Sequence, residues 1–282
     1  MIAVTGATGN LGGLVVADLL ERGVAPAGIV AVVRSRDRAA HLAAAGVQVR
    51  VADYDDPVAL VSAFTGVERL LLVSGSEPGR RVGQHGNVID AAVEAGVRSL
   101  AYTSITKAET SGIALAPDHL ATEDLLADAP LATTVLRNNW YYENYTAGLE
   151  STLSQGQLLS ATDGASFNPA ARPDLAAAAA GVLTGEGHEG RIYELAGPSV
   201  TLAKLAATIA ETSGTPVTVV ELPAPAYREA LLAAGLPAPV AAMLVDADEG
   251  IARGDLEVEE SDLERLVGRP LIPFAEVVRA AL

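Results

Sequence analysis

The first residues whose types and spacing suggest chemistry are three glycines near the start of the chain. Gly6, Gly9 and Gly12 lie between the apolar run 1–4 and an apolar stretch at helical spacing, so they occupy a strand-to-helix turn. In such a turn the glycines allow a tight bend, a close approach by a pyrophosphate, and close packing of the helix on the strand. The backbone amides at the helix start favour a phosphate. We therefore predict a dinucleotide-binding turn formed by Gly6, Ala7, Thr8, Gly9, Asn10 and Leu11.

An arginine after the second predicted strand indicates which dinucleotide binds. The apolar run 28–33 is followed at once by Arg34, and the nearest acid, Asp37, comes three residues later. At this position an acid binds the ribose 2′-hydroxyl of NAD, whereas an arginine accommodates the 2′-phosphate of NADP. We therefore expect NADPH as the cofactor. Asp53 and Tyr54 follow the third strand, 47–52, where the adenine would lie.

Two later stretches are predicted to lie at the nicotinamide end. The first is Ser74, Gly75, Ser76 and Glu77 after the fourth strand, 69–73, where mostly small side chains leave room for the nicotinamide ribose. The second is the aromatic stretch 138–145, which follows the sixth strand, 133–136. We expect cofactor contacts from Asn144 and Tyr145, and substrate contacts from Asn138, Trp140, Tyr141 and Tyr142. The alternative for the aromatic residues is that they pack two lobes together, as buried aromatic side chains mostly do.

The candidate catalytic residues are His119, Asn138 and Tyr142. His119 lies on a predicted helix, 118–128, after the fifth strand, 100–104, and from there it could touch the nicotinamide ribose. As a single histidine on a helix it could equally be a cap or a surface group. The four histidines, at positions 41, 85, 119 and 188, show no metal-ligand spacing, so no metal is expected.

Strands and helices alternate along the first half of the chain. This alternation predicts an α/β fold with a doubly wound parallel Rossmann sheet covered on both faces. We assign residues 1–137 to a nucleotide-binding domain and 138–282 to a smaller C-terminal substrate lobe, with later strands such as 191–195 available to extend the sheet. Residues 146–170, rich in Gly, Ser, Thr and Asn, are expected to be a loop that covers the ligand.

The composition excludes several classes of function. The chain has no cysteine, which rules out disulfides, iron–sulfur clusters and thiol catalysis, and its net charge of −16 argues against a nucleic-acid partner. No apolar stretch approaches the roughly 20 residues of a membrane span, and a strand begins at the first residue, so neither a membrane partner nor a signal peptide is expected. We predict a cytoplasmic protein and leave open whether it forms a homodimer.

Several motifs together resemble a known family. The chain is similar to the NmrA-like atypical short-chain dehydrogenases, and within them to the bacterial type 2 NAD(P)H:quinone oxidoreductases. The similar stretches are Thr5–Gly12, Arg34, 52–54, 102–104, 136–145, 188–197 and 266–270. The resemblance runs nearly end to end. It implies an NADPH-dependent, flavin-independent, two-electron reduction of quinones.

One departure from the wider superfamily bears on the substrate. The usual Tyr with Lys four positions later is absent, and Lys107 misses that spacing from Tyr102 by one residue. Reduction of a simple ketone needs an acid because an alkoxide is a poor product at neutral pH. A quinone instead gives a hydroquinone anion that delocalises its charge. The missing acid therefore suits a quinone, but it equally suits a non-enzymatic NADP(H) sensor. A reductase of another electron-poor carbonyl or alkene is a third alternative.

Overall fold

The structure is a computed structural model that describes residues 1–77 and 79–282. Within these residues the main sheet has seven strands in the order β3-β2-β1-β4-β5-β6-β9, all parallel. Ile2 pairs with Ile29 on one side and with Arg69 on the other, so the strand order reverses at β1. The strands are β1 (Ile2–Thr5), β2 (Ile29–Val33), β3 (Gln48–Val51), β4 (Arg69–Leu72), β5 (Ser99–Ile105), β6 (Ala132–Asn138) and β9 (Arg191–Leu195). The predicted doubly wound parallel sheet is confirmed.

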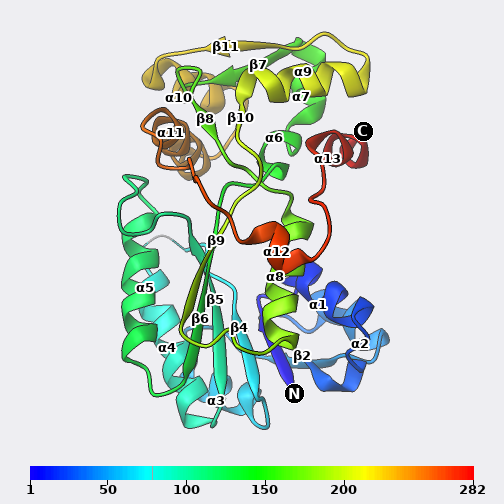
Figure 1. The fold of residues 1–282 in the computed structure, drawn as a ribbon, viewed down its shortest axis with the longest axis vertical. Helices are drawn as coiled ribbons and strands as arrows, with labels where there is room; N and C mark the ends of the chain where they lie inside the picture. The colour runs from blue at the N-terminus through cyan, green and yellow to red at the C-terminus, as the bar shows by residue number, and fades with distance from the viewer. Residues whose placement is uncertain (78) are drawn as a thin grey trace.

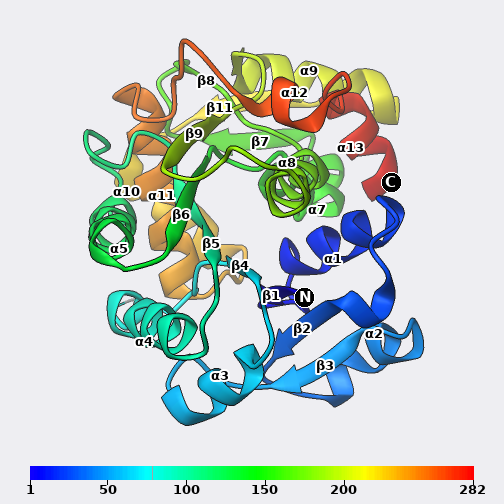
Figure 2. The same cartoon turned by 60° about the horizontal axis from the view of Figure 1, so that its bottom comes forward.

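Helices cover both faces of this sheet, as Figure 2 shows. One face carries α1 (Gly12–Glu21) and α8 (Arg172–Thr184), with α2 (Ala40–Ala44) and α12 (Leu263–Val267) beside them. The other face carries α3 (Pro57–Phe64), α4 (Arg81–Glu94) and α5 (Ala116–Asp128). Neighbouring strand residues point to opposite faces, so Val4 joins the core under α1 while Ala3 joins the core under α3 and α4. Burial on both sides explains why β1, β2 and β4 near the centre of the sheet are mostly apolar.

The remaining elements form a second lobe above the carboxyl ends of the main strands (Figure 1). It contains a two-stranded parallel pair, β7 with β11, and a two-stranded antiparallel pair, β8 with β10. The core of this lobe is built around buried residues such as Phe167, Leu205 and Val278. Its elements are α6 (Glu143–Thr146), α7 (Leu149–Gln155), β7 (Gln157–Ser160), β8 (Ser166–Phe167), β10 (Val200–Thr201), α9 (Leu202–Ser213), β11 (Thr218–Glu221), α10 (Ala224–Ala233), α11 (Ala238–Ala252) and α13 (Phe274–Ala281).

The two lobes do not divide at a single point in the sequence. Strand β9 pairs with β6 at the edge of the main sheet, and α8 packs against α1. Leu263 of α12 lies in the same core. Residues from the second half of the chain therefore complete the nucleotide-binding lobe. The predicted boundary at 137/138 marks only where the chain first leaves that lobe.

The expectation that residues 146–170 form a loop is wrong. This segment contains α7, β7 and β8, whose apolar side chains Leu149, Leu158 and Phe167 are buried in the second core. Each of these short elements buries about one large side chain among polar neighbours, so its periodicity is too weak to read from the sequence. Among the described residues, no helix combines the length and the apolar character needed to cross a membrane.

Candidate functional site

A cavity of about 650 Å³ lies at the carboxyl ends of the main strands, beneath the second lobe. Its wall comes from the segments after β1, β2, β3, β4, β5 and β6, and from helices α4, α5, α8 and α11. Parallel strands bring their carboxyl ends to one edge, and a crevice forms there because the strand order reverses between β1 and β4. The cavity therefore lies where this sheet topology places a ligand.

The glycine turn forms the floor of the cavity. Gly6 has a φ of +58°, and the amide of Gly9 donates to the Gly6 carbonyl at 2.8 Å. A Cβ on Gly12 would lie 2.4 Å from the Gly6 oxygen, so only glycine lets α1 begin this close to the turn. Of the predicted turn residues, Ala7 is the exception, because its side chain is fully buried in the core and is not part of the wall. The wall residues are Gly6, Thr8, Gly9, Asn10 and Leu11.

One end of the cavity is lined by basic residues after β2. Arg34 lies there as predicted, and its guanidinium forms an ion pair with Glu77 at 3.3 Å. Ser35 and Arg38 line the same end, although the sequence analysis did not select them. Arg38 follows Arg34 by about one helical turn, and this spacing could have identified Arg38 as a second basic residue at the same end of the cavity.

Asp53 and Tyr54 also line the cavity, after β3. The Tyr54 hydroxyl donates at 2.8 Å to the Val73 carbonyl, and it lies 2.5 Å from the Thr5 hydroxyl. Burial raises the pKa of Tyr54, so the phenol stays neutral. Tyr54 thus ties the end of β3 to β1 and to the segment after β4.

The segment Ser74–Glu77 lines the cavity, and its backbone is held by buried side chains. Glu77, expected at the nicotinamide end, instead lies beside Arg34 at the basic end. The Ser74 amide donates to the Thr103 hydroxyl at 2.9 Å, and the Gly75 amide donates to His85 Nε2 at 2.9 Å. Arg81 is 5% exposed and donates to the Gly75 carbonyl at 2.8 Å. These contacts hold the segment open along the wall.

Three polar residues of α4 at this wall were missed by the sequence analysis. Arg81 and Gln84 line the cavity, and His85 supports it from behind. They lie at positions i, i+3 and i+4 of one helix, and all three are buried. Polar residues repeating along the otherwise apolar face of a helix were the signal that could have identified them.

The other end of the cavity is lined by amides and aromatic rings. Asn138, Trp140, Tyr141 and Asn144 all contribute to the wall. The Arg172 guanidinium lies 4.8 Å from the centre of the Tyr141 ring and holds that ring in place. Asn138 Oδ1 is buried and has no hydrogen-bond partner within residues 1–77 and 79–282. Because Asn138 itself lines the cavity, a rotation of its amide that exposes this oxygen would let it accept a hydrogen bond from a ligand.

Two of the predicted aromatic residues lie elsewhere. Tyr142 is 2% exposed and its ring centre lies 4.9 Å from that of Phe274. Tyr145 packs against Phe167, at 5.9 Å between ring centres. Neither residue is part of the cavity wall, so their expected placement at the nicotinamide end is corrected. For these two tyrosines the packing alternative holds, because they fill the core of the second lobe.

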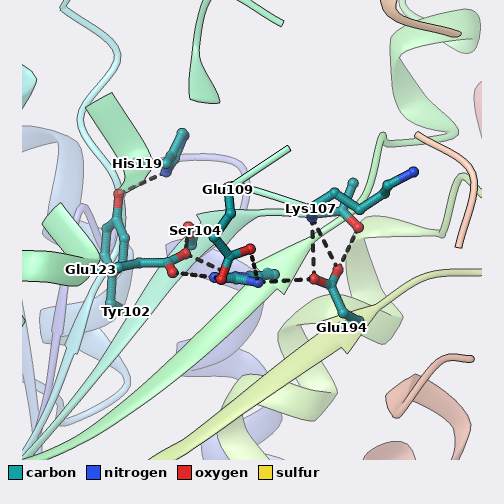
Figure 3. Close-up of polar contacts among 9 residues, drawn as sticks. Tyr102, Ser104, Lys107, Glu109, His119, Glu123 and Glu194 are labelled. Carbon is teal, nitrogen blue, oxygen red and sulfur yellow. Dashed lines mark hydrogen bonds and ion pairs between the residues drawn. The ribbon is translucent and has the colours of Figure 1, made fainter. Parts of the chain in front are cut away.

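His119 lines the cavity from α5, and it is 6% exposed. Its Nδ1 lies 2.7 Å from the hydroxyl of Tyr102, as Figure 3 shows. Burial, with the charge of Arg81 as a second cause, lowers the pKa of His119 to about 3. His119 is therefore a neutral imidazole at physiological pH, and it is neither a cap nor a surface group.

A buried ionic cluster supports the wall near His119 (Figure 3). Ser104 lines the cavity and donates its hydroxyl hydrogen to Glu123 at 2.5 Å. Arg137 binds Glu123 at 2.5 Å and Glu109 at 2.6 Å, and its attraction lowers the pKa of Glu109. Because the Ser104 hydroxyl hydrogen is donated to Glu123, the hydroxyl oxygen can act towards a ligand only as a hydrogen-bond acceptor.

The structure holds no Tyr–Lys pair at this wall among the residues that it describes. The Lys107 ammonium instead donates to the Gly254 carbonyl at 2.9 Å, outside the cavity. The described residues also contain no group of three or more His, Cys, Asp or Glu side chains that could hold a metal ion.

The cavity fits NADP. The glycine turn suits a pyrophosphate, because Gly9 lines the cavity and has no Cβ to block a close approach to the backbone. Arg34 and Arg38 at one end suit a 2′-phosphate, and the amide side chains of Asn138 and Asn144 at the other end suit a polar ligand group.

Comparison with known proteins agrees with this geometry. Residues 6–186 match the NAD(P)H-binding family model. Quinone oxidoreductase 2 of Escherichia coli strain K12 is 47% identical over 99% of this chain and 97% of its own. The structure of the Escherichia coli NADPH-dependent quinone oxidoreductase in complex with NADPH superposes with a TM-score of 0.94 at 46% identity, over 99% of each chain. The triphenylmethane reductase of Citrobacter sp., solved with NADP(H), gives a TM-score of 0.95 at 39% identity over the full length of both chains. The chain therefore belongs to the NAD(P)H-binding family.

Proposed function

We propose that this protein reduces quinones with NADPH by direct hydride transfer, without a flavin. The observation that carries the proposal is one cavity that joins the arginines after β2 to the amide- and ring-lined end after β6. Such a cavity has room for a dinucleotide at one end and a planar acceptor at the other. When bound, NADPH supplies the hydride.

The protein's own residues have three tasks in this proposal. The glycine turn binds the pyrophosphate, and Arg34 and Arg38 bind the 2′-phosphate, which selects NADPH. At the other end, Trp140 and Tyr141 present flat apolar surfaces on which a quinone ring can lie. The cavity holds the two reactants in contact, which is the main contribution that an enzyme without a strong acid can make.

The amide side chains orient the acceptor. Asn138 and Asn144 line the cavity, and Asn138 Oδ1 has no hydrogen-bond partner within residues 1–77 and 79–282. We assign the two amides to hydrogen bonds with the nicotinamide amide and with the quinone or hydroquinone oxygens. A ligand that supplies the missing partner of the Asn138 oxygen is favoured.

The relatives support the substrate class. The 47% identical Escherichia coli protein is named a quinone oxidoreductase. For this chain, the particular quinone, a cytoplasmic location and a homodimeric assembly stay predictions.

The test is NADPH oxidation by purified protein that has been shown by absorbance to contain no flavin. Benzoquinone and naphthoquinone are supplied separately, beside a reaction without quinone and a reaction without protein. We expect protein-dependent NADPH oxidation that requires a quinone and produces hydroquinone in equal amount. Tight NADPH binding without turnover would instead favour an NADP(H) sensor. Turnover only with a dye or an activated alkene would favour the third alternative.

A further inference from the structure

The buried histidines at the cavity have hydrogen-bond partners that determine where each carries its hydrogen. For His85, the Gly75 amide donates to Nε2, so Nε2 is an acceptor and the ring hydrogen lies on Nδ1. This agrees with the contact of Nδ1 with Thr122 at 2.9 Å, because the Thr122 hydroxyl hydrogen is already donated to the Asp118 carbonyl. His85 is therefore the Nδ1–H tautomer.

His119 is in the opposite situation. The Tyr102 side chain is fully buried, and its hydroxyl hydrogen needs an acceptor. His119 Nδ1, 2.7 Å away, is the stronger of the two acceptors near this hydroxyl, because an imidazole nitrogen is more basic than the Thr122 hydroxyl oxygen, which already receives the hydrogen of His85. With Nδ1 accepting, a neutral His119 carries its hydrogen on Nε2. Nε2 has no hydrogen-bond partner within residues 1–77 and 79–282, and it is not among the fully buried unpaired atoms, so it opens on the cavity that the ring lines.

We propose that His119 donates a hydrogen bond from Nε2 to the oxygen of the bound electron acceptor, and that Tyr102 is the residue that positions it. This inference rests on the proposed quinone reduction. It assigns to His119 the task of stabilising negative charge as it develops on the quinone oxygen, which a preorganised donor does well in a water-poor cavity. Tyr102 acts through His119 by fixing its tautomer and its ring orientation.

The reaction balances without a proton from His119. The hydride takes two electrons and one proton from NADPH to the quinone, which leaves NADP⁺ and a hydroquinone monoanion. The monoanion takes its second proton from water, while His119 keeps its own Nε2 hydrogen throughout. A neutral imidazole is suited to this role because it can donate a hydrogen bond without giving up its proton.

Burial and a nearby cation keep the His119 imidazole neutral. Burial opposes protonation of His119 most, and the positive charge of Arg81 adds to this effect. Two acids on the same helix are already engaged, since Asp118 pairs with Arg81 and Glu123 pairs with Arg137. A positive charge on His119 would therefore face a cation and lack a free carboxylate partner.

The first test is the ¹⁵N spectrum of the free protein, labelled at its histidines. We expect His119 to show a pyrrole-like Nε2 and a pyridine-like Nδ1, and His85 to show the reverse, with both signals unchanged between about pH 5 and pH 8. The Tyr102→Phe variant should lose the fixed Nε2–H pattern at His119. A His119 that carries its hydrogen on Nδ1, or that titrates near neutral pH, would overturn the inference.

The second test distinguishes a contact of His119 with the quinone from a contact of His119 with NADPH. His119→Leu should lower kcat/KM for the quinone by about 10- to 100-fold, as expected for one lost hydrogen bond to a charged oxygen, and leave the Kd for NADPH unchanged. His119→Gln, which keeps an N–H donor at a similar position, should recover part of that loss. Tyr102→Phe should give a smaller loss than His119→Leu. A weakened NADPH affinity with an unchanged quinone kcat/KM would instead place His119 at the ribose and overturn the inference.

A matched control exists outside the cavity. His188 Nδ1 contacts the Tyr193 hydroxyl at 2.9 Å, and neither residue is part of the wall. His188→Leu should therefore leave quinone reduction unchanged. An inactive parent protein would overturn the proposed function itself. An active parent with an equally active His119→Leu variant would overturn only the role of His119.

Discussion

Arg34 faces Glu77 across the basic end of the cavity, and each side chain is partly exposed. Arg80 binds Glu77 as well, at 3.0 Å. Glu77 therefore keeps a cation beside it when Arg34 turns to a phosphate. This arrangement lets Arg34 exchange a carboxylate for the 2′-phosphate of NADPH without leaving Glu77 unpaired.

We expect Arg34→Ala to weaken NADPH binding by about 10- to 100-fold, because it removes a charge-assisted hydrogen bond. NADH has no phosphate at that position, so its affinity should change little. Fluorescence titration with each cofactor measures both effects. Arg36→Ala is the matched control, because the Arg36 side chain donates to the Val49 carbonyl and lies outside the wall. Equal losses for NADPH and NADH would contradict this assignment.

Asp248, in the second lobe, gives a residue-scale prediction about stability. It is 4% exposed, and burial raises its pKa from 3.8 to about 7, although the Ala161 amide donates to it at 2.9 Å. The folded state thus holds a proton that the unfolded state releases between about pH 4 and pH 7. Stability is lost as the pH rises through that window.

Asp248→Asn removes the ionisation and keeps an acceptor for Ala161. We expect a higher urea midpoint than the parent at about pH 8, and little difference at about pH 4, where the parent carboxyl is protonated. Glu249→Gln, on the exposed side of the same helix, should change neither midpoint appreciably. A parent that gains stability relative to Asp248→Asn as the pH rises would contradict the assigned pKa direction.

At the residue scale, the sequence predicted which segments reach the cavity better than it predicted which of their side chains point into it. Arg34, Asn138 and Tyr141 lie at the wall because they follow strands whose ends meet at one edge. Tyr142 does not, because the chain at Tyr141 is extended and paired with Ala170, so the next side chain turns into the second core. That pairing joins residues far apart in the sequence, and no local pattern signals it.

At the scale of elements, the glycine turn and α1 form one unit. A Cβ on Gly12 would meet the Gly6 carbonyl carbon and oxygen at 2.8 and 2.4 Å, and both are backbone atoms. We expect Gly12→Ala to displace α1, to lower the free energy of unfolding by about 1–3 kcal/mol and to abolish tight NADPH binding. Calorimetric unfolding and a cofactor titration check the two effects.

The control for this change is the adjacent residue. A Cβ on Gly13 would lie 3.5 Å from the Ala7 carbonyl oxygen, which is an ordinary contact. Because Gly13 is inside α1, Gly13→Ala should preserve NADPH binding and stabilise the helix by up to about 1 kcal/mol. Equal damage from both variants would argue against the close approach of the helix to the turn.

Arg137 joins three elements through buried charges. It lies at the end of β6 and binds Glu123 of α5 and Glu194 of β9. Arg137→Met would leave Glu123, which is 7% exposed, without its cation, so we expect a loss of about 3–5 kcal/mol in urea unfolding. Glu109→Gln removes the most exposed acid of the cluster and should cost less than about 1 kcal/mol. Similar losses from both would show that burial of Glu123 is not the cause.

At the scale of the whole molecule, the two lobes differ in how far the sequence predicts them. Strands β1, β2 and β4 are mostly apolar runs, because both faces of the sheet are buried. The strands of the second lobe are short, and β8 holds only Ser166 and Phe167. Its stability comes from contacts between distant segments, which leave little periodicity in the sequence.

The central claim about the whole molecule is that the hydride passes directly from the cofactor at one end of the cavity to a quinone at the other. The most direct test is single-turnover oxidation of protein-bound NADPH on mixing with benzoquinone, using flavin-free protein and NADPH with or without deuterium at the transferred C4 position. We expect one hydroquinone for each NADPH oxidised, and a slower reaction with deuterium. Bound NADPH that stays unoxidised, or that is oxidised only after flavin is added, would contradict the claim.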